Sequence, residues 1–544
     1  MSCKFFPFDP SGDPRSATAF NNPAMQLFGN RFFSDQTRSE LLVEFLLVVF
    51  SNKKIGSGGE FVSCLPEMSD LMAWSNEKLA YSPKARLNLK LFSLLGASKL
   101  DSRHKTHREH HQALIQELED RIDMDGNGDK DSITRTLENL FLGFQGAGSG
   151  RTWCAQSFIP LSDGLLSRET IWKESKARVK SVDSWEELFP SKNSNKYFDM
   201  TQHVFLARGG EVLFLQLCNA LRQPKSKIKA WGATSDLGFS QEELDPGWLH
   251  KALEDEFERF KSHCPSALTR IAEFIDEKLD PDTPEKTDGP EDDRRFINAG
   301  WCRTESWQEG YVFAVEIYRL LRAGLDIVDR IHLLEIACAL QVLRSLAVQS
   351  ERLLNPKDSD GKIKYRLAIS APVDNRPAIR RLSQLSVKNI EKQIYQALRN
   401  GDAALPENEG KKLRILNQAD KSYGGKLFIS LSKKLGFIIP RLGPGARFVI
   451  NQQILRFLVI TNIPLGGRLT LDSFKEKIES RHGMVFDADG MDRASQWLTG
   501  TGLYLPADTD YWLQEMLEAA GFLIQLSDSC ALVSNPADDI NKEV

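Results

Sequence analysis

The chain has 544 residues, of which 41% are hydrophobic and 26% charged, and its formal net charge at pH 7 is −4. This composition predicts a soluble globular protein of about three or four domains with enough apolar residues for a core. The acidic balance, with a pI near 6.2, excludes a protein that is basic over its whole surface. Any contact with nucleic acid therefore requires a local basic patch.

The cysteines and the apolar runs indicate the cellular compartment in which the protein is expected. Eight cysteines are scattered without paired spacing, several of them in apolar surroundings, which is typical of reduced, buried thiols in a cytosolic protein. The N-terminal residues lack the apolar segment of a signal peptide. The most apolar run, Leu41–Phe50, contains Glu44 and is too short to cross a bilayer. We therefore expect a cytoplasmic protein without a membrane partner.

Residues 1–145 are expected to form a helical N-terminal domain. Pro, Gly, Asn and Asp are frequent before Arg31, which predicts an irregular arm. Thr37 and Glu40 have the spacing of a capping box. The helix that follows them is apolar nearly all round, so it should be central to this domain.

Three features between residues 104 and 152 resemble ligand sites without meeting their requirements. One helical face carries His104, His107 and His111. These histidines stand among charged residues with no cysteine nearby, which favours an exposed helix over a metal site. The run Asp123–Asp131 begins like a calcium loop, but Thr134 occupies the place of the bidentate glutamate. The glycine-rich run Gly143–Thr152 lacks the lysine and the spacing of a phosphate loop. We predict no metal and no cofactor.

Residues 146–279 are expected to form a mixed, mostly helical domain. Gly209 and Gly210 precede an apolar helical pattern, so the free N–H groups of a helix start should lie there. The candidate anion site beside those groups consists of His203, Arg208 and Glu211. The alternative is that the glycines form a turn and that these side chains are structural. No catalytic residues are predicted, because no catalytic motif stands out.

The next two segments differ sharply in composition. Residues 280–295 are acidic, contain prolines and have few apolar residues, which predicts a linker or a solvated loop. Residues 296–405 are predicted to form a helical domain. The pattern is almost continuously helical from Trp307 to Leu354 with a pause at Ala323–Gly324, which indicates a helical hairpin in the core. An amphipathic helix is expected over Ile379–Leu398.

Residues 406–462 are predicted to form a basic winged-helix-like unit. Apolar residues recur at helical spacing from Gly425, and the helix should end at Gly436, because glycine readily takes the left-handed conformation. Two short strands then enclose a loop rich in Gly and Pro. A helix followed by strand, loop and strand is how a winged helix ends, and Arg441 and Arg447 flank the loop, which would be the wing.

The basic residues of this unit predict a DNA contact. Few acids follow Asp420, so the helix and the wing could neutralise phosphates. The residues predicted to contact DNA are Lys426, Lys433, Lys434, Arg441 and Arg447. Charge reversal at Lys433, Lys434 and Arg447 should weaken DNA binding and flatten its salt dependence. The alternative is that the lysines are the solvated face of a protein-interaction module.

Residues 463–544 repeat the pattern and are predicted to form a second winged-helix-like unit. A helix begins near Tyr511 and should end at Gly521, and two strands follow it around a polar turn. The helix is acidic and carries Asp508, Asp510, Glu515 and Glu518. DNA would repel such a face, so we expect this unit to pack against protein.

Two stretches carry a resemblance to a known family. They are Ala207–Glu211, which reads ARGGE, and Lys434–Phe448, which reads KLGFIIPRLGPGARF. The chain resembles large proteins encoded in bacterial anti-phage defence islands, and among them the B subunit of the type I Druantia system. Other defence systems, including those linked to DNA phosphorothioation, remain open. The resemblance implies an accessory component that works beside a separately encoded large helicase, and it supplies no catalytic residues.

The sequence therefore predicts a mainly α, multidomain protein with tandem winged-helix-like units that carry small β-hairpins. The leading hypothesis for its function is a non-enzymatic recognition or accessory subunit of a multi-protein bacterial anti-phage defence system. In this hypothesis it contacts DNA through the basic winged helix, and its partners are the other subunits of the complex. One alternative is a divergent nuclease or phosphate-handling enzyme that uses His203, Arg208 and Glu211. The other is a scaffold that binds only proteins.

Overall fold

The computed structural model describes residues 4–83, 208–262 and 296–538, except 15, 357–361, 374–375, 402, 404 and 528–529. Between 84 and 207 it describes two short strand pairs, β4 (Ala85–Arg86) with β5 (Arg168–Glu169) and β6 (Ile171–Trp172) with β7 (Phe198–Asp199). The histidine-bearing face, the calcium-like run, the glycine-rich run, His203 and the acidic segment 280–295 lie outside the described residues.

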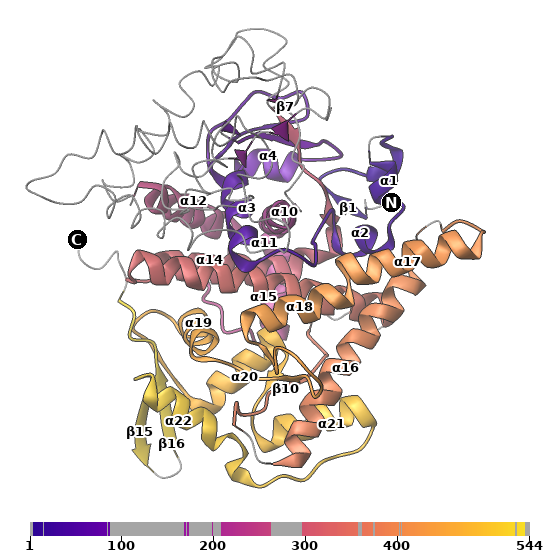
Figure 1. Ribbon diagram of the computed structural model, residues 1–544. Coiled ribbons are helices and arrows are strands. Elements are labelled where there is room, and N and C mark those ends of the chain that lie inside the picture. Colours follow the sequence, from indigo (N-terminus) through magenta and orange to yellow (C-terminus); the bar gives the residue numbers. More distant parts are fainter. Residues whose placement is uncertain are drawn as a thin grey trace, which may run out of the picture.

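The described part is mainly helical, as predicted, and is built around four helices. They are α3 (Arg38–Phe50), α10 (Gly209–Leu221), α14 (Trp307–Arg322) and α15 (Ile327–Leu354), which pack against one another. Figure 1 shows α14 and α15 across the middle of the molecule, between N-terminal elements above and C-terminal elements below. Two further helices, α11 (Lys225–Ser235) and α12 (Pro246–Ser262), complete this central body.

Two of these helices confirm predictions in detail. The Thr37 side chain accepts from the backbone of Glu40 and the Glu40 side chain accepts from the backbone of Thr37, so the capping box at the start of α3 is present. Residues 40–49 of α3 are buried, which makes it a central helix. The hairpin of α14 and α15 breaks at Ala323, as the pause in the pattern indicated.

Among the described residues, α15 is the one helix long and apolar enough to cross a membrane. Of its apolar window, 89% is buried inside the protein, because α3, α14 and α16 (Pro377–Asn400) cover it. An apolar helix enclosed in this way serves as core.

The prediction of an irregular N-terminal arm is wrong. The first residues form β1 (Phe5–Phe6), the 3₁₀ helix η1 (Pro10–Gly12), α1 (Ala17–Phe20) and α2 (Pro23–Phe28). Strand β1 pairs with β9 (Cys302–Arg303), which lies just before the 3₁₀ turn η5 (Thr304–Ser306). Phe5, Phe6 and Phe28 are buried there, so apolar side chains override the turn-forming composition.

A three-stranded sheet joins distant segments beside this arm. Its order is β2 (Asn52–Ile55), β3 (Leu79–Ser82) and β8 (Ile297–Asn298), all antiparallel. The short helix α4 (Met68–Ala73) lies between β2 and β3 along the chain.

The basic segment consists of α16, α17 (Glu409–Tyr423) and α18 (Gly425–Leu435), followed by β11 (Ile438–Ile439) and β12 (Arg447–Phe448). Helix α18 ends at Gly436, whose φ of +76° is the left-handed conformation expected there. The two strands pair antiparallel, as predicted. In Figure 1 α16 runs out to one side of the molecule, and α17 and α18 return along it.

The C-terminal segment contains four helices: α19 (Gln452–Asn462), α20 (Leu471–His482), α21 (Ala488–Thr499) and α22 (Tyr511–Ala519), the last preceded by η7 (Ala507–Asp510). Its antiparallel sheet has the order β13 (Arg468–Thr470), β16 (Cys530–Ser534) and β15 (Leu523–Ser527). The predicted helix end at Gly521, with φ of +75°, and the hairpin after it are both present.

The two C-terminal segments and the central body share one hydrophobic core. This single cluster has members from Phe5 to Ala537. It includes residues from both sides of the predicted domain boundaries at 405/406 and 462/463. A second, smaller cluster lies where β10 (Leu367–Ala368) pairs in parallel with β14 (Met484–Val485) under α16 and α21. This strand pair links the segment before the basic unit to the segment after it.

Candidate functional site

The five residues predicted to contact DNA are divided between the surface and the interior. Lys426 on α18 and Arg441 in the wing are exposed, and Lys433 is half-buried. Arg447 is only 7% exposed and donates to the Pro372 carbonyl over 2.9 Å.

Lys434 lies on the side of α18 that faces the N-terminal region. Its ammonium donates to the carbonyl oxygens of Asp35 and Gln36 over 3.1 and 3.0 Å. On the same side, the Ser430 hydroxyl donates to the Ser34 carbonyl over 3.3 Å. Lys434 and Arg447 therefore connect the basic segment to the rest of the protein, which leaves Lys426, Lys433 and Arg441 as the predicted residues oriented toward solvent.

A mixed cluster lies where α16, α17 and α18 meet. Burial and the charge of Asp420 raise the pKa of Glu391, while Lys433 and Lys388 act in the opposite direction. The effect requires all four charges to be close together, so Lys433 belongs to a surface that α16 and α17 also form.

Helices α16 and α17 add further cations to this surface; sequence reasoning missed those of α16, and it counted those of α17 in the basic unit without naming them as DNA contacts. They are exposed and comprise Arg380, Arg381, Lys388, Lys392, Lys411, Arg414 and Lys421. From residue 377 to 450 the sequence has fourteen lysines and arginines against five aspartates and glutamates. This imbalance was visible in the sequence, but the prediction counted charges only after residue 410 and so left out α16. We call the exposed cations of α16, α17, α18 and the wing the basic surface.

The predicted anion site at the start of α10 is occupied by carboxylates of the chain itself. The Gly210 N–H donates to a Glu44 carboxylate oxygen over 2.9 Å, and the same oxygen accepts from the Gln36 amide over 2.7 Å. Burial raises the pKa of Glu44 to about 7. An external anion at this helix start would have to displace Glu44.

Glu211 and Arg208 are also held by neighbouring groups. One Glu211 oxygen accepts from the Tyr81 hydroxyl over 2.6 Å, and the other accepts from the Gly300 N–H over 3.2 Å. Arg208 lies 4.0 Å from the Glu211 carboxylate and donates to the Asn298 carbonyl over 3.4 Å. These contacts fasten α10 to the sheet β2–β3–β8.

The glycine pair is explained by close packing. A Cβ atom on Gly210 would lie 2.2 Å from the Phe45 backbone nitrogen, and one on Gly209 would lie 2.4 Å from the Gln36 side chain. Only glycine allows α10 to approach α3 this closely.

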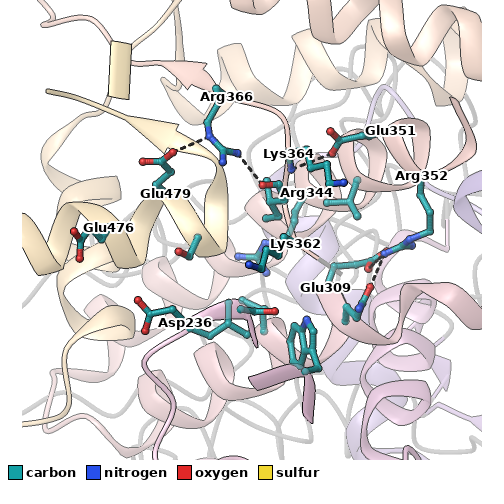
Figure 2. Close-up of a pocket in the computed structure, with 18 of the residues that line it drawn as sticks. Asp236, Glu309, Arg344, Glu351, Arg352, Lys362, Lys364, Arg366, Glu476 and Glu479 are labelled. Carbon is teal, nitrogen blue, oxygen red and sulfur yellow. Dashed lines mark hydrogen bonds and ion pairs between the residues drawn. The ribbon is translucent and has the colours of Figure 1, made fainter. Parts of the chain in front are cut away.

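A charged pocket that could not be predicted from the sequence lies between the central body and the C-terminal segment. Its cavity volume is about 350 Å³, and its walls come from α11, α14, α15, α20 and the segment before β10. Figure 2 shows the charged residues that surround it. They are Asp236, Glu309, Arg344, Glu351, Arg352, Lys362, Lys364, Arg366, Glu476 and Glu479. No single stretch of the sequence indicates the pocket, because five separate segments supply these residues.

Several charges of the pocket are paired within its walls. Arg352 lies 3.1 Å from Glu309, and Arg366 lies 2.7 Å from Glu479. Glu351 accepts from the Lys364 backbone N–H over 3.4 Å, and burial raises its pKa.

Arg344 lines the pocket and is part of a buried polar network. Its guanidinium donates to Glu316 over 2.6 Å, to Gln341 over 2.8 Å and lies 3.1 Å from His482 Nδ1. Burial, together with Arg344 and Arg481, lowers the pKa of His482. The imidazole is therefore neutral, and Nδ1 can accept a hydrogen bond from Arg344.

One group of potential metal ligands occurs among the described residues, formed by Cys64, Glu254 and Glu258. Both Glu254 oxygens already accept backbone N–H groups, from Cys64 and Leu65, over 2.7 Å each. Burial raises the pKa of the Cys64 thiol, which keeps it protonated. The group thus serves to connect α12 with the loop after β2.

No protein-family model, no curated protein and no solved structure matches this chain. The functional argument therefore rests on the geometry and the charge of the described residues.

Proposed function

We propose that this protein contacts nucleic acid through the basic surface. The observation that carries the proposal is the concentration of charge: residues 377–450 hold fourteen basic and five acidic side chains in a chain whose net charge is −4. Concentrated cations on one face neutralise phosphates, and the release of counterions drives binding.

The arrangement of the elements supports the same proposal. Helix α18 runs directly into the hairpin β11–β12, and the loop between the strands exposes Arg441. Lys426 is exposed on α18, and Lys421 is exposed on α17. A helix that leads directly into a wing, both with exposed cations, resembles the way a winged helix grips a duplex. In this proposal the duplex lies along the solvent side of α17 and α18, because residues 34–36 cover the Lys434 side.

The C-terminal unit has a separate role in this proposal. Its sheet order, β13–β16–β15, places the first strand beside the last, as a winged helix does. Glu515 and Glu518 are exposed on α22, together with Tyr511, while Asp510 is buried and lies 2.8 Å from Lys475. An acidic face with an exposed aromatic residue suits a protein partner better than a phosphate backbone.

The resemblance to defence-island proteins gives these two surfaces a context. We propose an accessory, non-enzymatic subunit in which the basic surface holds DNA and the C-terminal unit binds another subunit. Co-expression with the genes encoded beside its own, followed by affinity purification, tests this role. Recovery of the chain alone would contradict it.

Fluorescence anisotropy with a labelled duplex of about 20 base pairs tests the nucleic-acid contact. The triple variant Lys421→Glu, Lys426→Glu, Arg441→Glu should bind at least ten-fold more weakly than the parent. It should also reduce the slope of log K against log salt by about 3, because each phosphate contact contributes about 0.9.

The matched control reverses two exposed lysines of the central body, in the variant Lys229→Glu, Lys251→Glu. It makes the whole protein more acidic without altering the basic surface, so its affinity should remain within about two-fold of the parent at moderate salt. Equal losses in the two variants would show a general charge effect and would contradict a site at the basic surface.

A further inference from the structure

The loop of the wing carries an apolar side chain that the proposed function does not use. Leu442 is 89% exposed, and residues 440–445 on both sides of it are exposed as well. A Cβ atom built on Gly443 would meet no other atom within 4 Å, so the loop projects from the body of the protein. Single exposed leucines are common on protein surfaces, so the surroundings of Leu442 decide what it indicates.

The base of the wing is held firmly. The Phe448 N–H donates to the Ser383 hydroxyl of α16 over 2.8 Å, and the Phe448 carbonyl accepts from the Ser370 hydroxyl over 3.0 Å. The rings of Phe437 and Phe448 lie 4.9 Å apart and close the hairpin on its core side. The exposed loop therefore starts and ends at fixed points, which lowers the entropy that binding has to overcome.

The surroundings of the loop are basic. Arg441 directly precedes Leu442 and is exposed. A Cβ atom on Gly445 would lie 3.6 Å from the Gln384 side chain, so the loop borders α16 at that residue. Arg380 and Arg381 stand four and three positions before Gln384, which places them on the same side of α16, and both are exposed. An apolar side chain thus projects from a region whose arginines come from two elements.

On the basis of the nucleic-acid contact proposed above, we propose that the wing enters the minor groove of a DNA duplex and that Leu442 inserts between two base pairs. An apolar wedge of this kind partly unstacks one base step and kinks the duplex, while neighbouring cations hold the phosphates. The inserted leucine is removed from water, and Arg441 and the arginines of α16 neutralise the backbone on either side of the groove.

The proposal defines a preferred form of DNA. Insertion into an intact duplex has to overcome the stacking of the base step that it opens. In a duplex whose stacking is already interrupted, that cost is largely absent. The preferred substrate is therefore a duplex with a gap or another local interruption, and Leu442 is the residue that gives the preference.

Fluorescence anisotropy of the full chain with two labelled duplexes tests the proposal. One is an intact duplex, and the other has the same sequence with a one-nucleotide gap at its centre. The parent should bind the gapped duplex at least about five-fold more tightly. Leu442→Ala should reduce this preference to less than about two-fold, whereas the conservative variant Leu442→Met should retain it.

The matched control is Leu413→Ala on α17, because Leu413 is also an exposed leucine, 55% accessible, between basic residues of the same surface. It should keep the preference of the parent. Both leucines are exposed, so circular dichroism and the melting temperature of the two alanine variants should match those of the parent.

A second measurement detects the kink itself. With a donor and an acceptor dye at the two ends of the gapped duplex, the parent should raise the efficiency of energy transfer, because a kink brings the ends together. Leu442→Ala should bind without this increase. An increase of the same size with Leu442→Ala would overturn the proposal.

The outcomes separate this proposal from the nucleic-acid contact on which it rests. Salt-dependent binding of both duplexes with equal affinity would overturn the wedge and leave the contact in place. A gap preference that Leu442→Ala retains, or that Leu413→Ala loses equally, would also overturn the wedge. Absence of binding to either duplex would overturn both proposals.

Discussion

The central body and the basic surface use charged residues in opposite ways. In the central body, Glu44, Glu211 and Glu316 are buried and accept hydrogen bonds from nearby donors of the same chain. On the basic surface, Lys421, Lys426 and Arg441 face solvent. The difference shows that a charged residue whose sequence context suggests a ligand site indicates such a site only under one condition. Other groups of the folded chain must not already bind that residue.

The two regions should therefore respond differently to mutation. Changes in the central body should alter stability with little effect on nucleic-acid affinity, whereas changes on the basic surface should alter nucleic-acid affinity with little effect on stability. The following variants are arranged from the largest expected effect to the smallest.

The largest effect is expected at Glu316, whose side chain is 0% exposed and pairs with Arg344 over 2.6 Å. Glu316→Ala leaves the Arg344 guanidinium buried without its carboxylate, and this should cost about 3–5 kcal/mol. Urea unfolding measures the loss. The double variant Glu316→Met, Arg344→Met removes both charges and should be more stable than Glu316→Ala, because no charge remains buried without a partner. A double variant less stable than the single one would contradict the assignment.

The second largest effect is expected at Glu44, which makes the stability of the folded state depend on pH. Burial raises its folded pKa to about 7, above the ordinary value near 4.5. Between pH 4.5 and 7 the folded state therefore binds more protons at Glu44 than the unfolded state does. This preferential protonation contributes to the stability of the folded state at low pH, and the contribution is lost as the pH rises from 4.5 through 7. Glu44→Gln mimics the protonated form. It should be more stable than the parent by about 2–3 kcal/mol at pH 8 and nearly equal to it at pH 4.5. A difference that does not vary with pH would show that Glu44 is ionised throughout.

A steric variant tests the close packing of α10 on α3. Gly210→Ala places a methyl group 2.2 Å from the Phe45 backbone nitrogen, so the helices must separate, which should cost about 1–3 kcal/mol in urea unfolding. The matched control is Gly247→Ala on α12, where the nearest atom to the added Cβ would be 3.5 Å away. That variant should be stabilised by about 0.5–1 kcal/mol, because alanine favours the helix. Equal effects at the two positions would contradict the packing argument.

The smallest effects distinguish two lysines of α18. Lys434→Ala removes the ammonium from two backbone carbonyls and should destabilise the protein by about 1 kcal/mol. Lys426→Ala should change stability by less than about 0.5 kcal/mol, because the side chain is exposed. In DNA binding the order should be reversed, with Lys426→Ala the weaker binder. If Lys434→Ala lowered affinity more than Lys426→Ala without a loss of stability, the orientation of α18 would be wrong.

Local elements could be predicted from the sequence because their signals are local. The capping box at Thr37, the glycine stop at Gly436 and the hairpin after it all depend on residues within a few positions. The N-terminal arm was mispredicted because its turn-forming residues outweighed Phe5 and Phe6, whose partner strand is about three hundred residues away in the sequence.

Sites that depend on distant contacts could be predicted only in part. The identity of Lys434 and Arg447 as basic residues was clear, but their orientation depends on carbonyl groups of residues 35, 36 and 372. The charged pocket is invisible in the sequence for the same reason, since its five wall segments meet only in the fold. The density of basic residues, by contrast, can be read from the sequence without knowledge of the fold. A count that began at residue 377 would have included α16 in the basic surface.

The salt dependence of duplex binding by the unmodified chain tests the central claim most directly. The account predicts measurable affinity at about 50 mM salt and a linear fall of log K against log salt, with a slope of about −4 to −6 for contact with roughly five or six phosphates. Failure to bind at 50 mM salt, or a slope close to zero, would contradict a nucleic-acid contact at the basic surface.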